Sequence, residues 1–562
     1  MTLEEVEAAL CAPGQKFGME TVSIRGVPTR VWKNIPATFA DLARQARTHG
    51  NAELMVLNDE RVTYEQWFRA TAALAHAMVD MGIEKGDRVA LVMRNIPEWP
   101  VIYFAATSIG AIIVPLNAWW TGHELSYGLR DSGAKLLVAD CERMDRFDGH
   151  EDALRAVPHR LCARGEHAYA TGTIEGVIGP SSHWADLPDQ DIPHVETQPD
   201  DRATILYTSG TTGAPKGALG TQRSTLTNIL STGYSGARGF LRRGEPVPEP
   251  QPRTSLLVVP FFHATGCNAV LMSVMAGGSR LILMDRWEPV EAMQLIEREG
   301  VQQTGGVPTI AWQLLDHPDR DKFDLSSLEG ISYGGAPSAP ELVQKIFEVF
   351  GALPGNGWGM TETCATVTTH GAEDYLNRPT SCGPPVAVAD LKIMDVDGRE
   401  ELPPGEIGEL YARGPMVVEG YWNKPEATAE TFVDGWVRTG DLAKLDEEGF
   451  CFIVDRAKDI VIRGGENIYS LEVEDALYEH PAVTDAAVVG IPHRSLGEEP
   501  AAVVHLAAGR TATEDELRAW VRERLAAFKV PVRILFTPET LPRNANGKIL
   551  KKDLKAMFES NG

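Results

Sequence analysis

One segment of the sequence combines residue types that together could bind a phosphate group. The segment TSGTTGAPKG runs from Thr208 to Gly217 and places Lys216 behind three threonines, a serine and two glycines. Glycines let backbone N–H groups approach an anion, hydroxyl groups donate to phosphate oxygens, and a lysine adds positive charge. The order differs from a Walker A loop, which needs Gly, four residues and then Gly-Lys-Ser/Thr. The segment predicts a phosphate-binding loop of another kind, with a polar surface linker as the alternative on composition alone.

Two acidic residues further along the chain have the chemistry to serve a nucleotide. Glu362 follows Thr361 in GWGMTET, and a carboxylate is a suitable ligand for a Mg²⁺ ion that bridges phosphate oxygens. Asp441 in RTGD could accept hydrogen bonds from ribose hydroxyls, with Arg456 as a second contact. Plainer interpretations exist: a carboxylate at an exposed helix start for Glu362, and a turn or surface ion pair for Asp441 and Arg456.

Alternating strand and helix patterns must position these side chains. Apolar, strand-like runs recur at Val89–Met93, Ala134–Asp140, Thr204–Thr208, Ser255–Pro260, Arg280–Met284 and Gly330–Tyr333. Capping boxes at Thr63–Gln66 and Thr513–Glu516 predict helix starts, the second helix running to about Phe528. Such alternation predicts an α/β fold with a largely parallel, helix-covered sheet. From about Gly383 onward, short strands and turns predict a β-rich subdomain.

The chain is expected to divide into a large domain, 1–455, and a small mobile α+β domain, 456–562. Within the small domain we expect Ser470 to cap a helix. Lys551, Lys552 and Lys555 have the pattern of a basic tail. In the large domain, residues 234–254 are rich in Gly, Pro and Arg and predict a surface loop.

Composition and charge exclude several classes of protein. The 562 residues carry a formal charge of −25, which argues against nonspecific binding of nucleic acid or anionic lipid. The stretch Trp99–Gly122 has no charged residue, but polar residues and Pro115 interrupt it, so it predicts a buried helix to about Gly110 and a strand at Ala111–Leu116 rather than a membrane span. The N-terminus is acidic, unlike a secretory signal, and the seven scattered cysteines form no CxxC pair. We expect a cytoplasmic protein, either monomer or homodimer.

Seven motifs in order carry a resemblance to a known family. Besides the phosphate-loop segment they are Tyr333–Pro337 (YGGAP), Gly357–Thr363 (GWGMTET), Arg438–Asp441 (RTGD), Asp455–Asp459 (DRAKD), Gly464–Asn467 (GGEN) and Pro542–Lys548 (PRNANGK). Together they resemble the adenylate-forming superfamily, which includes acyl-CoA synthetases, firefly luciferase and nonribosomal-peptide adenylation domains.

The resemblance implies a set of site residues. Those that would bind ATP or AMP are Thr208, Ser209, Gly210, Thr211, Thr212, Gly213, Lys216, Gly334, Gly335, Ala336, Pro337, Gly357, Trp358, Gly359, Met360, Thr361, Asp441 and Arg456. Catalytic roles would fall to Lys548, Glu362 and His263, with Glu362 and Thr208 as ligands of Mg²⁺. Gly464 and Gly465 would line the path of CoA, and Lys458 would be the hinge of the small domain. His263, which follows two phenylalanines, also fits an ordinary core histidine, and Trp358, residues 305–308 and the Ser338 region would line the acid pocket.

The resemblance implies an ATP- and Mg²⁺-dependent carboxylate–CoA ligase that forms an acyl-adenylate and then a thioester. Because the sequence ends fourteen residues after Lys548, an appended carrier domain is not expected, which favours CoA as the thiol. The alternatives are a ligase that loads a separate carrier protein, a luciferase-type oxygenase and a non-catalytic nucleotide-binding protein. The arrangement Asn356-Gly-Trp358 resembles ligases of the fatty-acid type, while medium-chain, long-chain, aromatic and steroid-derived acids all stay open.

Overall fold

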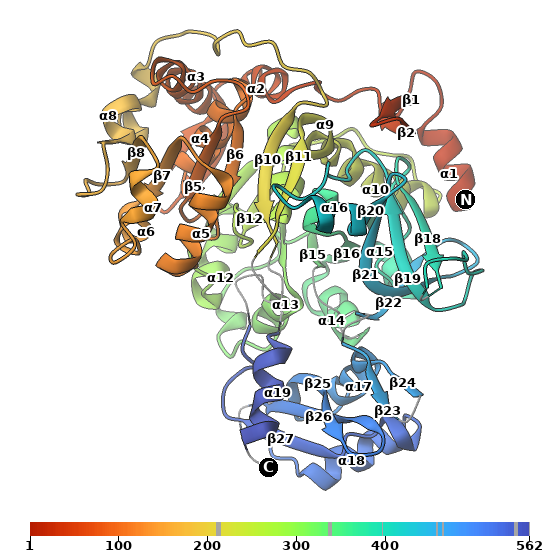
Figure 1. The fold of residues 1–562 in the computed structure, drawn as a ribbon. Coiled ribbons are helices and arrows are strands. Elements are labelled where there is room, and N and C mark those ends of the chain that lie inside the picture. Colours follow the sequence, from red (N-terminus) through yellow and green to blue (C-terminus); the bar gives the residue numbers. More distant parts are fainter. Residues whose placement is uncertain are drawn as a thin grey trace.

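The computed structural model spans residues 1–562 and describes 1–208, 215–334, 340–395, 397–456, 459–463, 466–507, 509–543 and 549–560. Two large sheets and one five-stranded sheet form the upper body of the molecule in Figure 1, and a second five-stranded sheet lies apart below them. A two-stranded ribbon, β1 (Met19–Ile24) and β2 (Val27–Trp32), lies with α1 (Leu3–Leu10) at the edge of the body. The predicted α/β class is confirmed.

The first large sheet has the strand order β11-β10-β6-β5-β7-β8-β9. Its strands are β5 (Arg88–Val92), β6 (Ile112–Pro115), β7 (Leu136–Asp140), β8 (His159–Ala163), β9 (Gly172–Thr173), β10 (Arg202–Tyr207) and β11 (Gly217–Thr221). All neighbours are parallel except β10 and β11, which are antiparallel. That single reversal lets a short loop connect β10 to β11, and this loop is the predicted phosphate loop.

The second large sheet has the order β17-β16-β15-β14-β12-β13-β3-β4. Its strands are β3 (Glu53–Leu57), β4 (Glu60–Thr63), β12 (Thr254–Leu257), β13 (Arg280–Leu283), β14 (Gln303–Gly306), β15 (Gly330–Gly334), β16 (Leu353–Trp358) and β17 (Thr368–Gly371). The six strands from β16 to β3 are parallel to their neighbours, so their carboxyl ends lie along one edge. In open parallel sheets ligands bind outside these ends, and the motif residues Gly334 and Trp358 are the last residues of β15 and β16.

Helices cover both sheets, and one core fills the space between them. The helices of this part are α2 (Phe39–Arg47), α3 (Tyr64–Asp80), α4 (Glu98–Ser108), α5 (Gly122–Ser132), α6 (Cys141–Asp145), α7 (Asp152–Arg155), α8 (Ile174–Ile178), α9 (Gln222–Leu226), α10 (Asn228–Arg242), α11 (Met272–Gly277), α12 (Pro289–Glu299), α13 (Pro308–Leu315), α14 (Pro340–Phe350) and α15 (Ala372–Asn377). Every residue of α4 is buried, and α4 packs with α3 in a core that contains side chains of both sheets. The predicted buried helix and following strand are therefore confirmed as α4 and β6. Among the described residues, no helix has the length and apolar character needed to span a membrane.

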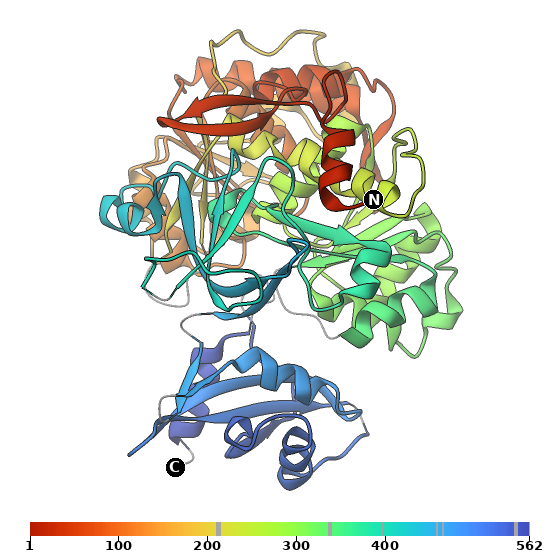
Figure 2. The same cartoon turned by 90° about the vertical axis from the view of Figure 1, so that its right-hand side faces the viewer.

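The β-rich subdomain and the C-terminal unit follow. The subdomain contains β18 (Asp390–Met394), β19 (Gly408–Arg413), α16 (Pro425–Thr431), β20 (Phe432–Val433), β21 (Trp436–Leu445) and β22 (Cys451–Arg456). The C-terminal unit contains β23 (Val461–Arg463), β24 (Glu466–Ile468), α17 (Ser470–Tyr478), β25 (Val483–His493), β26 (Gly497–Leu506), α18 (Glu514–Arg522), β27 (Arg533–Thr537) and α19 (Lys551–Ser560). Figure 2, turned by 90°, shows the same separation of this unit from the body.

Local predictions have mixed outcomes. The capping boxes at Thr63 and Thr513 are confirmed, but the helix from Thr513 ends at Arg522 rather than near Phe528, which lies in a separate 3₁₀ turn. The predicted loop 234–254 is wrong over its first part, because α10 continues to Arg242. Ser470 is the first residue of α17 instead of its cap, because its hydroxyl and N–H both donate to the buried carboxylate of Asp455.

Candidate active site

The two ends of the predicted phosphate loop are held together by hydrogen bonds. Thr208 N donates to Lys216 O at 2.8 Å, and Lys216 N donates to Thr208 Oγ1 at 3.3 Å. Beside them, Tyr207 pairs with Gly217 in the β10–β11 ladder. A strand pair thus fixes the base of the loop, although residues 209–214 lie outside the described part.

Lys216 and Glu362 both contact Tyr421, one at its ring and the other at its hydroxyl group. Lys216 Nζ lies 4.6 Å from the centroid of the Tyr421 ring, within the range of a cation–π contact. The Tyr421 hydroxyl donates to Glu362 Oε1 at 2.7 Å, a short hydrogen bond to a buried carboxylate. Burial and the neighbouring Glu362 raise the pKa of Tyr421, so its hydroxyl keeps its proton and acts as the donor. The structure therefore brings together the predicted phosphate-loop lysine and the predicted metal-binding carboxylate.

Tyr421 is a site residue that sequence reasoning missed. It lies in the segment Glu419–Asn423, which is hydrogen-bonded along β11: Leu219 N donates to Gly420 O at 2.9 Å and Trp422 N donates to Gly217 O at 2.8 Å. In the sequence GYWN, Tyr421 has the pattern of a residue that packs in a core. The signal that could have marked this segment is the preceding Gly420, because its φ is 156° and a Cβ there would lie 2.5 Å from Thr428 Cγ2.

A strained turn holds Glu362. After the 3₁₀ turn Thr361–Thr363, Cys364 and Ala365 have φ values of 49° and 103°, which L residues rarely adopt. A Cβ on Gly359 would lie 1.4 Å from Ala365 O, so only glycine fits where the turn folds back. The GWGMTET motif therefore codes for a tight backbone reversal that points Glu362 into the interior.

The ends of β15 and β16, which carry residues predicted to bind ATP or AMP, lie against each other. Gly334 pairs with Gly357 in parallel register, and a Cβ on Gly334 would lie 2.8 Å from Gly357 O. Met360 N donates to Thr363 Oγ1 at 3.0 Å, which fixes the chain between Trp358 and Glu362. The two glycines thus bring the backbones of two predicted ATP- or AMP-binding motifs close together.

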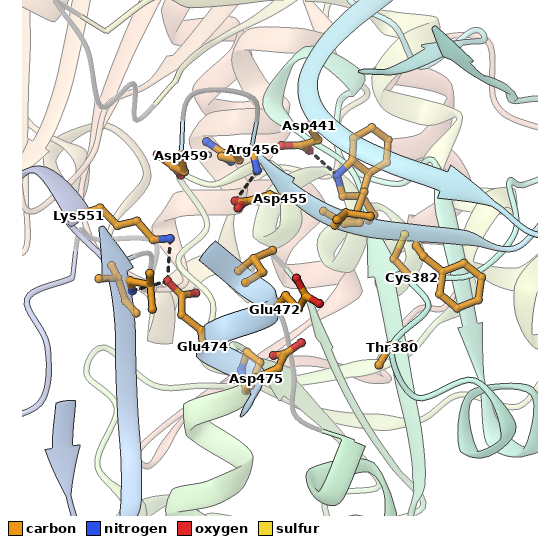
Figure 3. A pocket seen from close by; sticks show the side chains of 18 of the residues that line it. Thr380, Cys382, Asp441, Asp455, Arg456, Asp459, Glu472, Glu474, Asp475 and Lys551 are labelled. Atoms are coloured by element: carbon orange, nitrogen blue, oxygen red, sulfur yellow. Dashed lines mark hydrogen bonds and ion pairs between the residues drawn. The ribbon is translucent and has the colours of Figure 1, made fainter. Parts of the chain in front are cut away.

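Trp358, Asp441 and Arg456 form a second group at the same edge. The Trp358 indole N–H donates to Asp441 Oδ2 at 2.8 Å, and Arg456 Nε lies 3.3 Å from Asp441 Oδ1. Asp441 and Arg456 face each other on β21 and β22. Figure 3 shows Asp441 and Arg456 at the wall of a cavity of about 1070 Å³. Trp358 and Arg456 therefore hold the Asp441 carboxylate in one orientation, which a residue that binds a ribose needs.

The residues present fit a Mg²⁺ ion that arrives with a nucleotide. Tyr421 occupies Glu362 Oε1, and within the described residues no donor binds Oε2. The described residues also contain no group of three or more His, Cys, Asp or Glu side chains able to hold a metal by themselves. Mg²⁺ is commonly bound by one or two carboxylates together with substrate phosphates and water, and Glu362 meets that requirement. Thr208, the second predicted ligand, lies at the base of the loop.

The predicted His263 lies beyond β12, next to aromatic side chains. Its ring centroid is 4.8 Å from that of Phe262, which in turn contacts Trp119 at 5.1 Å. His263 O accepts from Cys267 N at 2.9 Å at the start of a π-helix, Thr265–Leu271. π-helical turns are frequent at functional sites, and the half-buried imidazole fits either predicted interpretation.

The far wall of the cavity comes from the C-terminal unit. Glu472, Glu474 and Asp475 of α17 and Lys551 of α19 line it, as Figure 3 shows. Lys551 Nζ lies 2.7 Å from Glu474 Oε1 and donates to Ser470 Oγ at 2.6 Å. Burial disfavours the charged form of Lys551, but the carboxylates of Glu474 and Asp455 outweigh it and raise its pKa. The prediction that Lys551 belongs to a basic tail is wrong, because this lysine is part of a buried polar network.

Two carboxyl groups near this wall have raised pKa values. Burial raises the pKa of Asp455 to about 6. Burial and then Glu474 raise the pKa of Asp475 to about 7. The cavity thus has a wall with Trp358 and Arg456 on one side and a carboxyl-rich helix on the other.

Several predicted site residues lie outside the described part of the chain. They are Ser209, Gly210, Thr211, Thr212, Gly213, Gly335, Ala336, Pro337, Lys458, Gly464, Gly465 and Lys548. The neighbouring region of Ser338 lies outside it as well.

Comparison with known proteins gives two family matches. The family model described as "AMP-binding enzyme" matches residues 42–422, and the model described as "AMP-binding enzyme C-terminal domain" matches residues 472–548. A feruloyl-CoA synthase from Amycolatopsis sp. is 35% identical over 515 residues, covering 92% of this chain and 98% of that protein. A long-chain-fatty-acid–CoA ligase from Bacillus subtilis (strain 168) is 34% identical over 523 residues, covering 88% of this chain and 90% of that protein.

Solved structures agree with these matches. An o-succinylbenzoate CoA synthetase from Bacillus subtilis, solved in complex with its acyl-adenylate intermediate, is 30% identical to this chain. It superposes with a TM-score of 0.76 and covers 92% of this chain and 98% of its own.

Proposed function

Since the chain belongs to the AMP-binding enzyme family, we propose that its site performs the two half-reactions of a carboxylate–CoA ligase. The enzyme joins a carboxylic acid to the thiol of CoA with the use of ATP and releases AMP and pyrophosphate. The observation that carries the proposal is the line of contacts from Lys216 through Tyr421 to Glu362, continued along the chain to Trp358 and Asp441. One cation and two oriented carboxylates near one another support the binding of a nucleotide at this edge.

In the first half-reaction, a carboxylate oxygen of the acid attacks the α-phosphorus of ATP, and pyrophosphate leaves. Lys216 and the closed base of its loop bind phosphate oxygens, and Asp441 accepts hydrogen bonds from the ribose. A Mg²⁺ ion held by Glu362 and Thr208 would neutralise negative charge on the phosphates. The chain's own contribution is to fix these groups before the two anions meet.

In the second half-reaction, the CoA thiolate attacks the acyl carbon, and AMP leaves with the electron pair of the broken C–O bond. By the family resemblance, we assign Lys548 to adenylate formation, Gly464 and Gly465 to the path of CoA, and Lys458 to the hinge between domains 1–455 and 456–562. One site must exclude water in the first step and admit a thiol in the second, and a domain rotation meets both needs. The cavity between Asp441 and α17 supports such a rotation, because it separates the two units at this edge.

The acid that we propose is an apolar monocarboxylic acid of the fatty-acid or aromatic class. Phe262 and Trp119 beside His263 supply an apolar surface. The relatives compared above differ in their acids, one being a feruloyl-CoA synthase and one a long-chain-fatty-acid–CoA ligase.

The free cysteines support a reducing compartment, and we propose that the enzyme works in the cytoplasm as a monomer or homodimer.

The test measures pyrophosphate and AMP release over a panel of acids, from octanoate and palmitate to benzoate and ferulate, with and without CoA. We expect AMP release that depends on both the acid and CoA for at least one class. A panel in which no acid gives CoA-dependent AMP would contradict the proposal, and AMP release that needs a carrier protein instead of CoA would favour the carrier-loading alternative.

Lys548→Ala should abolish adenylate formation, whereas Lys552→Ala, at an exposed position four residues on, should keep it.

A further inference from the structure

Tyr421 contacts two parts of the site that the sequence places far apart. Its hydroxyl donates to Glu362 Oε1 at 2.7 Å, and its ring lies 4.6 Å from Lys216 Nζ. Glu362 and Tyr421 are 7% and 8% exposed, so water competes little for this hydrogen bond. A single side chain therefore fixes the distance between the loop lysine and the proposed metal-binding carboxylate.

We propose that Tyr421 is a positioning residue for adenylate formation. Its hydroxyl holds the Glu362 carboxylate in one rotamer with Oε2 directed to the metal, and its ring holds the Lys216 ammonium for the phosphates. The proposal rests on the proposed function, because it concerns the same site. It assigns to a residue outside all seven motifs a role that neither Lys216 nor Glu362 can fill.

The surroundings of Tyr421 leave its side chain little freedom. Its N–H donates to Thr428 Oγ1 at 2.9 Å, and its ring packs edge-on against Phe432 at 5.4 Å. It also pairs across an isolated bridge with Ala218 on β11. A ring fixed from the strand and from α16 is a rigid support, which a mobile side chain would not be.

The hydroxyl and the ring can be tested separately. Tyr421→Phe keeps the ring against Phe432 and Lys216 and removes only the donor to Glu362. Tyr421→Leu removes both contacts. Tyr169→Phe is the matched control, because Tyr169, in the turn between β8 and β9, also donates to a carboxylate, Asp148 Oδ1, at 2.8 Å.

The readout is the binding of Mn²⁺ in the presence of an ATP analogue with an imido group in place of the α,β-bridging oxygen, which blocks the bond that the first half-reaction breaks. The loss of the electron paramagnetic resonance signal of free Mn²⁺ measures this binding. We expect Tyr421→Phe to weaken Mn²⁺ binding about 10- to 100-fold, the usual effect of removing a hydrogen bond from a metal-ligating carboxylate. Binding of the analogue in EDTA should stay unchanged in Tyr421→Phe and weaken in Tyr421→Leu. Tyr169→Phe should leave both unchanged.

A double variant tests whether Tyr421 acts through Glu362. Adding Tyr421→Phe to Glu362→Gln should cost no further Mn²⁺ affinity, because the group that Tyr421 positions is already lost. Full Mn²⁺ affinity in Tyr421→Phe, or additive losses in the double variant, would overturn the proposal. If Tyr421→Phe weakens Mn²⁺ binding as expected but no acid gives CoA-dependent AMP, the proposed function fails while the positioning of Glu362 by Tyr421 stands.

Discussion

Asp455 should make the attachment of α17 depend on pH. Its carboxylate is 1% exposed and accepts hydrogen bonds from Ser470 N, from Ser470 Oγ at 3.0 Å and from Arg456 N at 2.7 Å. Burial raises its pKa from the ordinary 3.8 to about 6, because desolvation penalises the charged form. The protonated carboxyl is therefore favoured in the folded chain. Its contribution to stability is full below pH 3.8 and is lost as the pH rises through 6.

The change from 3.8 to about 6 corresponds to about 3 kcal/mol over the whole titration, of which about 2 kcal/mol falls between pH 4 and pH 8. Asp455→Asn removes the titration and keeps an oxygen that can accept from Ser470. The variant should lack this part of the pH dependence, so its stability relative to the unmodified protein should rise by about 2 kcal/mol from pH 4 to pH 8. Asp475 titrates in the same range in both proteins, so it cancels in the difference.

Hydrogen exchange of the α17 amides, corrected for intrinsic rates, measures the opening free energy of this helix at each pH. Asp515→Asn is the control, because the Asp515 side chain is 96% exposed and lies on α18 instead of at the start of α17. Parallel curves for Asp455→Asn and the unmodified protein would refute the reasoning. They would mean that Asp455 is not desolvated in the folded chain.

Two further predictions concern the edge of the site. Gly359→Ala places a Cβ 1.4 Å from Ala365 O, so it should lower the free energy of unfolding by about 3 kcal/mol or more and abolish pyrophosphate release. Gly236→Ala, which has open space around it in α10, should instead stabilise the chain by about 0.5–1 kcal/mol. Thermal unfolding measures both changes, and equal effects of the two variants would contradict the close approach at Gly359. Trp358→Phe removes the indole donor from Asp441 and should raise the KM for ATP about tenfold, as expected for a hydrogen bond to a charged group, with a smaller change in kcat. Steady-state pyrophosphate release measures both constants, and an unchanged KM would show that Asp441 does not need this orientation.

Elements encoded by local chemistry could be predicted from the sequence. The capping box at Thr63 and the apolar run of α4 and β6 depend on neighbours within a few residues or on burial of a whole segment. α10 could not be predicted beyond residue 234, because its glycines disfavour a helix and tertiary contacts override them. Tyr234 and Arg238 are buried there, and Arg238 donates to Pro385 O at 3.1 Å.

Motif order predicts a set of site residues, but it does not predict how they pair. Trp358 and Asp441 are 83 residues apart, and Tyr421 and Glu362 are 59 apart. Such contacts depend on how strands of different sheets meet, and no spacing in the sequence encodes that. For this reason Tyr421 was missed although all the motif residues around it were identified.

The same limit applies to charge, and two lysines show why. The net charge of −25 gives no indication of an anion-binding site. The segment Thr208–Gly217 predicts a phosphate-binding role for Lys216, but the sequence does not show which side chains surround Lys216 or Lys551. Lys551 forms an ion pair with the carboxylate of Glu474, which neutralises its charge within the fold. Within the described residues, Lys216 Nζ has no carboxylate partner and lies over an aromatic ring, which attracts a cation without cancelling its charge. An acidic protein can therefore bind a polyanion where a cation is held by a π face, and the contact between Lys216 and Tyr421 meets that condition.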